Sequence, residues 1–247
     1  MIGRGRQLLS KLLALARPGE LRMQRADCPM CGRTLVVKLA ENNVAVRCLR
    51  CRASAIHMSI ARVVRQLYPD MSRLVVYEMS SRGPFYDFLR RQAGALTCSE
   101  FFDDVAPGEF AGHVQCQDVQ RLTYANNSFD LCTSTEVFEH VPDDCRGFTE
   151  VHRVLRPGGR LIFTVPLTDD FLTVERARVV DGALQHILVP EYHGDVVRGH
   201  GKVLCFRNYG QDILQRLRKS GFQQARFVSV EYSEWWGMGV KVIVAEK

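Results

Sequence analysis

The chain has 247 residues, of which 46% are hydrophobic and 24% are charged, and its formal net charge is +6. This length and apolar content are sufficient for one full core with a small additional module. No apolar stretch approaches the roughly 20 residues that a membrane-spanning helix needs, so an integral membrane segment is excluded.

The positive charge is concentrated in the first quarter of the chain. Residues 1–65 contain 13 Lys and Arg against 3 Asp and Glu, whereas the other 182 residues contain 20 against 24. Such a segment can bind a polyanion such as RNA or an acidic membrane surface, or it can be a solvated face. We predict a basic amphipathic segment over residues 1–26, with a short helix that ends at Pro18-Gly19; a secretory or transit peptide is the alternative for its first 19 residues.

Four of the nine cysteines form two Cys-x-x-Cys pairs. They are Cys28, Cys31, Cys48 and Cys51. The sixteen residues between the pairs resemble a hairpin with its turn at 41–43. A hairpin brings the pairs together, so four thiolates can surround Zn²⁺. We therefore predict a structural zinc ribbon over residues 27–54, with a redox pair as the alternative. The other five cysteines are scattered, which is typical of free thiols in a reducing compartment and favours the cytoplasm.

Residues 55–247 alternate between apolar strands and amphipathic helices. The predicted strands are 73–79, 95–102, 113–119, 128–138, 160–167, 225–232 and 239–247, and the predicted helices are 56–67, 83–94, 144–155 and one that ends at 220–221. This alternation predicts an α/β fold with a doubly wound, seven-stranded, mainly parallel sheet. The connection between the last two strands is too short for a crossover helix, so we expect a C-terminal antiparallel hairpin.

Polar residues lie at or just beyond the carboxyl ends of the first four predicted strands. In doubly wound sheets, ligands bind beyond the carboxyl ends of the strands, near the point where the strand order reverses. The candidate residues are Glu78–Gly83, Glu100, Asp118 and the cluster Thr135–His140.

Two runs resemble the class I S-adenosylmethionine-dependent methyltransferases, in particular the type 11 methyltransferase-domain group. They are "QDVQRLTYANNSFDLCTSTEVFEHVPDD" at 117–144 and "EVHRVLRPGGRLIFTVP" at 150–166. The resemblance covers about residues 73–247, and a subgroup that carries an N-terminal cysteine ribbon and a "PEYHGD" stretch (190–195) is more similar still. It implies a methyltransferase domain over residues 55–247 with S-adenosyl-L-methionine as cofactor.

The resemblance also implies which residues bind this cofactor. Glu78 and the loop after it would approach the methionine moiety and the ribose, and Glu100 would accept hydrogen bonds from the ribose hydroxyls. Asp118 would face the adenine amino group. The full implied set is Glu78, Ser80, Gly83, Glu100, Asp118, Val119, Thr135 and Glu136. The sequence departs from the family in its first loop, which is usually rich in glycine but here reads "YEMSSRGPF".

Two histidines are the candidate catalytic residues. His140 follows the fourth strand, and His193 follows Tyr192 in the long segment before the last helix; each can act as a base or orient a substrate, or can be an ordinary loop or packed residue. We predict methyl transfer to an unidentified acceptor, either a small molecule or a sugar-containing metabolite. The alternatives are an RNA methyltransferase whose basic ribbon binds RNA, and a non-catalytic interaction module with the same fold.

Overall fold

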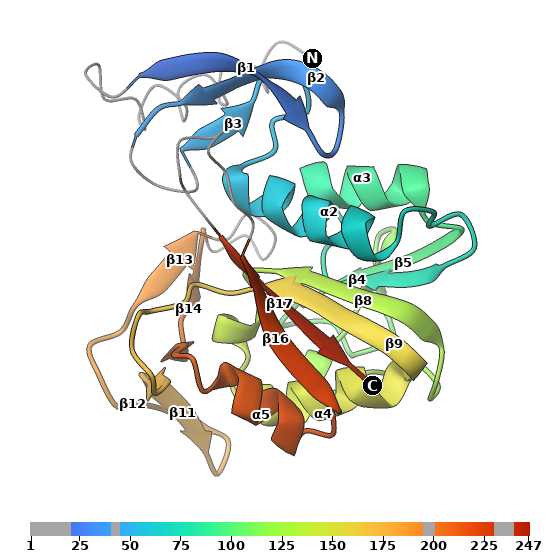
Figure 1. Ribbon diagram of the computed structural model, residues 1–247. Coiled ribbons are helices and arrows are strands. Elements are labelled where there is room, and N and C mark those ends of the chain that lie inside the picture. Colours follow the sequence, from blue (N-terminus) through green and yellow to red (C-terminus); the bar gives the residue numbers. More distant parts are fainter. Residues whose placement is uncertain (1–20, 41–44, 195–200, 230–239) are drawn as a thin grey trace. The chain divides into compact units, whose positions relative to one another are not determined.

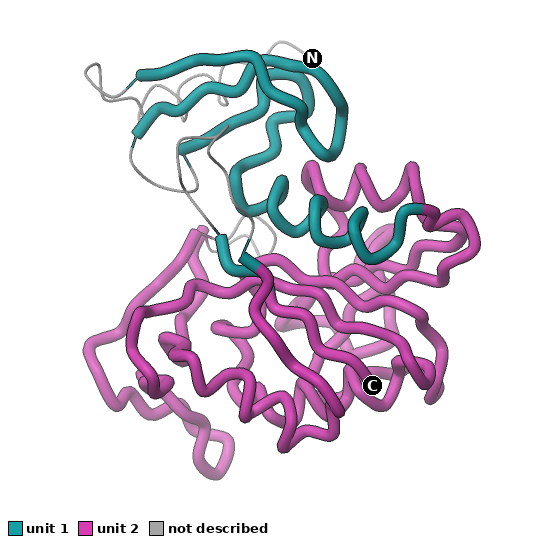
Figure 2. The backbone as a smooth tube through the Cα atoms, in the orientation of Figure 1, with its two compact units in different colours: residues 1–69, 229–242 teal, residues 70–228, 243–247 magenta. Residues whose placement is uncertain are grey.

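The computed structural model describes residues 21–40, 45–194, 201–229 and 240–247. These residues form two compact units (Figure 2). The first comprises 1–69 and 229–242, and the second comprises 70–228 and 243–247. In the described parts of the chain, none of the helices is long and apolar enough to cross a membrane. The predicted N-terminal helix and the hairpin turn at 41–43 lie outside the described residues.

The first unit contains the predicted ribbon. Its three antiparallel strands are β1 (Arg22–Cys28), β2 (Gly32–Lys38) and β3 (Val46–Cys48) (Figure 1). The β1–β2 register pairs Cys28 with Gly32, whose φ of +76° suits the tight turn between the strands. Helix α2 (Ala55–Leu67) follows the ribbon, as the sequence predicts, and begins at a capping box in which the Ser54 side chain accepts from the His57 backbone N–H. The domain boundaries predicted at 27–54 and 55–247 remain predictions.

The second unit contains the large sheet, and the doubly wound fold is confirmed. The strand order is β16-β17-β9-β8-β4-β5-β7-β6. The strands are β4 (Val75–Glu78), β5 (Ala95–Glu100), β6 (Phe110–Ala111), β7 (Val114–Cys116), β8 (Phe129–Thr135), β9 (Leu155–Thr164), β16 (Gln224–Ser229) and β17 (Lys241–Glu246). The pairs from β7 to β9 are parallel, whereas β17 runs antiparallel to β9. The sheet has one strand more than predicted, because the short strand β6 pairs antiparallel with β7 at the edge.

Helices cover both faces of this sheet. Figure 1 shows α4 (Asp144–Val154) and α5 (Ile213–Lys219) on one face and α3 (Pro84–Gln92) on the other. The N-cap of α4 is Asp143, whose side chain accepts from the Arg146 N–H, and the buried side of the helix includes Phe148 and Val151. Phe148 packs against Phe138 with the ring centroids 4.4 Å apart. These aromatic side chains are part of one continuous apolar core.

The boundaries of β8 and β9 differ from the prediction. Strand β8 ends at Thr135 instead of residue 138, because Glu136 has a φ of +54° and the short 3₁₀ helix η2 (Phe138–His140) follows. Strand β9 begins at Leu155 and therefore includes residues 156–159, which precede the predicted strand 160–167.

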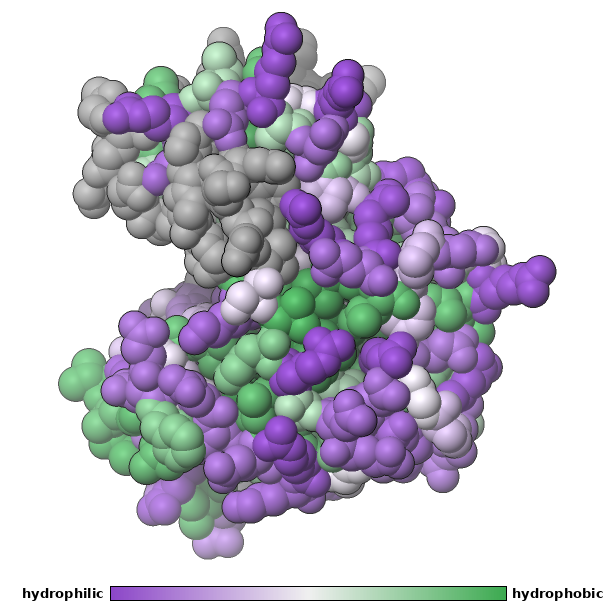
Figure 3. All heavy atoms as spheres, in the orientation of Figure 1, coloured by the Kyte–Doolittle hydropathy of each residue, from purple (hydrophilic) through white to green (hydrophobic). Residues whose placement is uncertain are grey.

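The long connection between β9 and α5 contains three small antiparallel pairs. They are β10 (Val174–Glu175) with β15 (Arg207–Asn208), β11 (Ala177–Val180) with β12 (Ala183–His186), and β13 (Tyr192–Gly194) with β14 (Lys202–Leu204). This connection exposes several apolar side chains, such as Val179 and Leu184, and green spheres accordingly gather at that side of the second unit (Figure 3).

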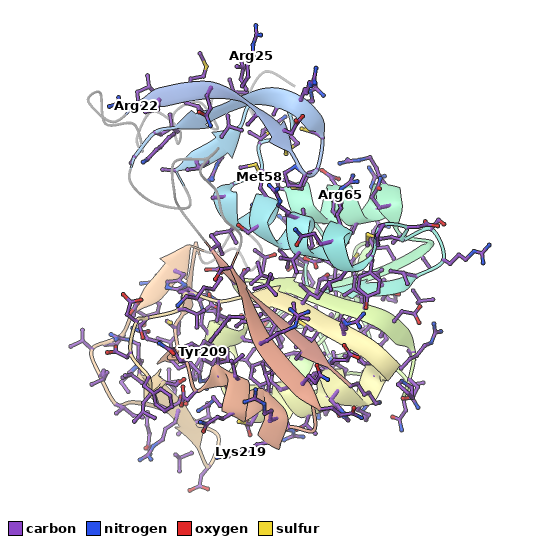
Figure 4. The ribbon with its side chains drawn as sticks, in the orientation of Figure 1. Arg22, Arg25, Met58, Arg65, Tyr209 and Lys219 are labelled. Carbon is purple, nitrogen blue, oxygen red and sulfur yellow. The ribbon has the colours of Figure 1, made fainter. Side chains whose placement is uncertain are left out.

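A buried ion-pair network anchors this connection to α4. The carboxylate of Asp144 accepts from Arg216 at 2.6 and 2.8 Å and from the hydroxyl of Tyr209 at 2.8 Å. Tyr209, which is labelled in Figure 4, is fully buried. Burial by itself would raise the pKa of Asp144, but the hydrogen bonds from Arg216 and the charge of Arg207 lower it below the ordinary value.

Candidate active site

The carboxyl ends of β4, β5, β7 and β8 border one cavity of about 500 Å³, a volume typical of small-molecule sites. Its lining combines apolar side chains with a few polar groups. The residues from the strand ends are Tyr77, Met79, Ser99, Glu100, Phe101, Asp103, Gln117, Asp118, Val119, Gln120, Glu136, Val137, His140, Val141 and Pro142. The cavity therefore lies where the topology of the sheet predicts a ligand.

Glu100 is held in the cavity wall by the loop that departs from the family pattern. Its Oε1 accepts from the Ser81 N–H at 2.8 Å, from the Ser81 hydroxyl at 2.9 Å and from the Ser80 hydroxyl at 3.3 Å. Its side chain is 10% exposed, and Arg82 approaches to 3.9 Å. The one remaining glycine, Gly83, has a φ of +96°, a conformation that favours glycine, and it caps α3. The serines thus fix the orientation of Glu100.

Asp118 and Val119 form a neighbouring part of the wall. Asp118 lies two residues after the end of β7 and is the N-cap of the 3₁₀ helix η1 (Val119–Arg121). Its Oδ1 accepts from the backbone N–H of Gln120 at 2.9 Å and from the Gln120 side chain at 3.0 Å. Glu100 and Asp118 thus line the same cavity from adjacent strands, as the sequence leads us to expect.

Four of the candidate cofactor-binding residues, Glu78, Ser80, Gly83 and Thr135, are not among the residues that line the cavity. Glu78 is 1% exposed, is not among the lining residues, and accepts a hydrogen bond from the Thr133 hydroxyl; burial raises its pKa to about 8. Because side chains alternate along a strand, its neighbours Tyr77 and Met79 line the cavity instead. The cofactor-binding roles of these four residues, like those of the candidates that line the cavity, remain predictions.

The turn after β8 brings acidic and imidazole groups to the cavity. Glu136 and His140 line it, and burial raises the pKa of Glu136 to about 8, with the Glu139 carboxylate adding to the rise. The His140 ring lies 4.9 Å from the ring of His193, centroid to centroid. Interaction with Glu139 raises the pKa of His193 above its ordinary value. The two candidate catalytic histidines are therefore close together, although 53 positions apart in the chain.

Sequence reasoning missed the part of the wall that comes from the β9–α5 connection. Gly194, Val203 and Phe206 line the cavity from there. The Phe206 N–H donates to the Glu139 carbonyl at 2.7 Å, and the buried Arg207 donates to the carbonyls of Phe138, Val141 and Pro142. The "PEYHGD" stretch was the one signal in the sequence that indicated this segment. Contacts between residues more than 60 positions apart, such as those of Arg207 with Phe138 and Val141, produce no local sequence pattern.

The ribbon brings its four cysteines together. The Sγ atoms of Cys28 and Cys51 are 3.7 Å apart, and those of Cys31 and Cys48 are 3.5 Å apart. Four sulfurs bound to zinc at about 2.3 Å would be separated by about 3.8 Å, so this arrangement fits a closed tetrahedral site. Hydrogen bonding among the thiols raises the pKa of Cys28 and lowers that of Cys48.

The arrangement is that of a class I methyltransferase-like fold, and comparison with known proteins agrees. Residues 87–163 match the family model described as "Methyltransferase domain", which confirms the resemblance over that segment. A ubiquinone biosynthesis O-methyltransferase of Coxiella burnetii is 42% identical over 50 residues, which are 20% of this chain and 21% of the relative. A phthiotriol/phenolphthiotriol dimycocerosates methyltransferase of Mycobacterium ulcerans is 30% identical over 117 residues, 45% of this chain and 43% of the relative. The chain thus spans about a fifth of the first relative and less than half of the second.

Solved structures are similar at lower identity. An S-adenosylmethionine-dependent methyltransferase from Mesorhizobium loti aligns with a TM-score of 0.49 at 17% identity, covering 76% of this chain and 98% of that one. A 1,6-didemethyltoxoflavin-N1-methyltransferase of Burkholderia thailandensis, solved with its substrate and S-adenosylhomocysteine, aligns with a TM-score of 0.47 at 19% identity, covering 78% of each chain.

Proposed function

We propose that this protein transfers a methyl group from S-adenosylmethionine to a small-molecule acceptor. The observation that carries the proposal is the pair of carboxylates, Glu100 and Asp118, that line one cavity at the ends of adjacent parallel strands. The matched methyltransferase domain extends across the segment that contains both residues.

The chain's own groups suit this cofactor. An ionised carboxylate such as Glu100 accepts charge-assisted hydrogen bonds from ribose hydroxyls, and Asp118 can accept from an exocyclic amine. The apolar side chains of Met79, Val119 and Val137 give the wall the dry surface that an aromatic base requires. We propose Glu78, Ser80, Gly83, Thr135 and Glu136 as further contributors to the same region.

The bound cofactor would supply an electrophilic methyl group, so the protein's contribution is positioning and exclusion of water. The cavity admits an acceptor beside Glu136 and His140, and its wall from the β9–α5 connection helps to enclose it. His140 and His193 are the groups placed to assist loss of a proton from the acceptor.

A small molecule or sugar-containing metabolite is the proposed acceptor. RNA is the second candidate, and a groove on the ribbon favours it, because Arg25, Arg33 and Arg50 line that groove. Arg22 and Arg25 also project from β1 (Figure 4). However, the described lining of the groove contains none of the aromatic side chains on which bases usually stack.

We further propose that the four cysteines bind a structural Zn²⁺ and that the protein works in the cytoplasm. All nine cysteines are free thiols, which suits a reducing compartment. A closed site of four thiolates has no open coordination position, so this metal would stabilise the ribbon and take no part in the transfer.

Isothermal titration of the full chain with S-adenosylhomocysteine tests the cofactor. We expect saturable binding, and no heat at high protein concentration would contradict the proposal and favour the non-catalytic interaction module. Incubation with methyl-labelled S-adenosylmethionine and separated cell fractions tests the acceptor. We expect label in the small-molecule fraction, whereas label confined to RNA would overturn that acceptor class.

A further inference from the structure

A cluster of three side chains beside the cavity has the composition of a metal site. Glu139 and His140 come from η2, and His193 comes from β13. One potential ligand atom from each residue lies within 4.8 Å of the other two. A carboxylate oxygen of Glu139 is 3.5 Å from His140 Nε2 and 3.6 Å from His193 Nδ1.

Glu139 is the residue that needs a partner. It is 0% exposed, and among the described residues neither of its carboxylate oxygens has a hydrogen-bond partner. An ionised carboxylate buried in this way is costly unless a positive charge compensates it. In the described parts of the chain, the side chains that form ion-pair contacts with Glu139 within 4 Å are those of His140 and His193.

The spacing is better suited to a shared cation than to direct hydrogen bonds. Strong charge-assisted hydrogen bonds from nitrogen to a carboxylate are about 2.7 to 2.9 Å long. Ligand atoms bound tetrahedrally at about 2.1 Å are instead separated by about 3.4 Å. The observed 3.5 and 3.6 Å are close to that separation. In the cysteine ribbon, the sulfur–sulfur distances of 3.7 and 3.5 Å are likewise close to the separation of about 3.8 Å expected for sulfur ligands, whose bonds to zinc are longer.

The surroundings orient the three side chains as the outer partners of metal ligands do. His140 Nδ1 lies 2.8 Å from the Leu204 carbonyl, which leaves Nε2 directed toward Glu139, and His193 Nε2 lies 3.4 Å from Glu191. The 2.8 Å contact of His140 is of the kind that metal-binding histidines usually make through their other nitrogen, and the longer approach of Glu191 places a carboxylate on the same side of the His193 ring. The guanidinium of Arg207 fixes η2 by donating to three of its nearby carbonyls.

We infer that Glu139, His140 and His193 bind a divalent transition-metal cation such as Zn²⁺, separate from the four-cysteine site. A neighbouring group, Glu191 with His193 and Cys205, also has suitable atoms. Its members already have partners, because Glu191 pairs with Arg176 at 3.2 Å and the Cys205 thiol donates to the Arg207 carbonyl at 3.1 Å.

Three protein ligands leave a coordination position open, and His140 lines the cavity. If the proposed function holds, this position would favour an acceptor with an oxygen that the cation can bind, such as a phenol, an enol or a hydroxy acid. The cation would act as a Lewis acid that eases loss of the acceptor's proton, and His140 and His193 would then assist that loss as ligands of the cation and not as bases.

Metal analysis of the full chain tests the inference without measuring activity. After saturation with Zn²⁺ and dialysis, we expect two equivalents in the unchanged protein and in His186→Ala. His186 is an exposed histidine of β12 and serves as the matched control. We expect His193→Ala to hold one equivalent and the isosteric Glu139→Gln to hold the second at least tenfold more weakly, with circular dichroism to confirm folding.

Cobalt(II) substitution identifies which site each equivalent occupies. In the unchanged protein, one equivalent should show the strong thiolate-to-metal absorption of the ribbon, and the second should add bands without it. A single equivalent in the unchanged protein, or two tightly bound equivalents in both variants, would overturn the inference and leave the cluster as a proton relay. Titration of the same samples with S-adenosylhomocysteine keeps this result separate from the proposed function, since cofactor binding can fail while both metals are retained.

Discussion

Replacing Glu100 by Gln is the sharpest test of the cofactor site. The change keeps the size of the side chain and removes its charge. All the described hydrogen bonds from Ser80 and Ser81 end on Oε1, so we expect Oε2 to serve the ribose hydroxyls. Hydrogen bonds to a charged group contribute about 1.5–3 kcal/mol, against about 0.5–1.5 for neutral pairs. A loss of about 1–2 kcal/mol is therefore expected, which corresponds to a 5- to 30-fold rise in Kd, roughly.

Isothermal titration with S-adenosylhomocysteine measures this change. The control is Glu109→Gln, which removes the same charge from an exposed position that is not among the cavity-lining residues. We expect the control to bind like the unchanged protein. If Glu100→Gln bound within twofold of the control while keeping its melting temperature, the assignment of Glu100 to the ribose would be refuted.

Three further predictions concern the ribbon and two buried acids. Cys48→Ser should reduce the zinc content by one equivalent, because a tetrahedral site loses one of its four ligands, and an unchanged zinc content would contradict the ribbon site. Asp144→Asn should destabilise the fold by about 3–5 kcal/mol in urea unfolding at pH 7, since it leaves Arg216 without its buried partner. The lowered pKa of Asp144 means that its stabilisation is present above the unfolded pKa and is lost as the pH falls through the folded one, so the variant should lose stability less steeply in acid. The pH dependence expected from Glu78 is opposite to that from Asp144. Because burial raises the pKa of Glu78 to about 8, the free energy of unfolding should fall as the pH rises from the pKa of Glu78 in the unfolded chain toward 8. Glu78→Gln should flatten that decline by an amount on the order of 5 kcal/mol, and identical pH profiles would disprove the assignment.

Local patterns in the sequence were sufficient for much of this molecule. The two Cys-x-x-Cys pairs, separated by one hairpin, indicate a shared site because short-range spacing alone brings them together. The order of strands and helices follows from periodicity, and that order by itself requires a parallel sheet with a ligand site at the strand ends. Glu100 and Asp118 could be predicted for this reason, since Glu100 is the last residue of β5 and Asp118 lies two residues after the end of β7.

The tertiary structure determined the features that depend on the direction of a side chain or on contacts between residues far apart in the sequence. The sequence predicts that Glu78 contacts the cofactor, and this stays a prediction; what it does not reveal is that alternation along β4 buries the Glu78 side chain outside the cavity lining, where burial raises its pKa. Glu136 adopts a left-handed backbone conformation, which ends β8 at Thr135 and allows η2 to follow. The apolar pattern of residues 128–138 gives no sign of this change in the backbone. The meeting of Glu139 with His193 depends on how the β9–α5 connection folds back onto η2, and a contact across 54 positions has no periodic signal in the chain. Spacing along the chain therefore determined the framework and the ribbon, whereas the packing of distant segments determined which buried charges face one another.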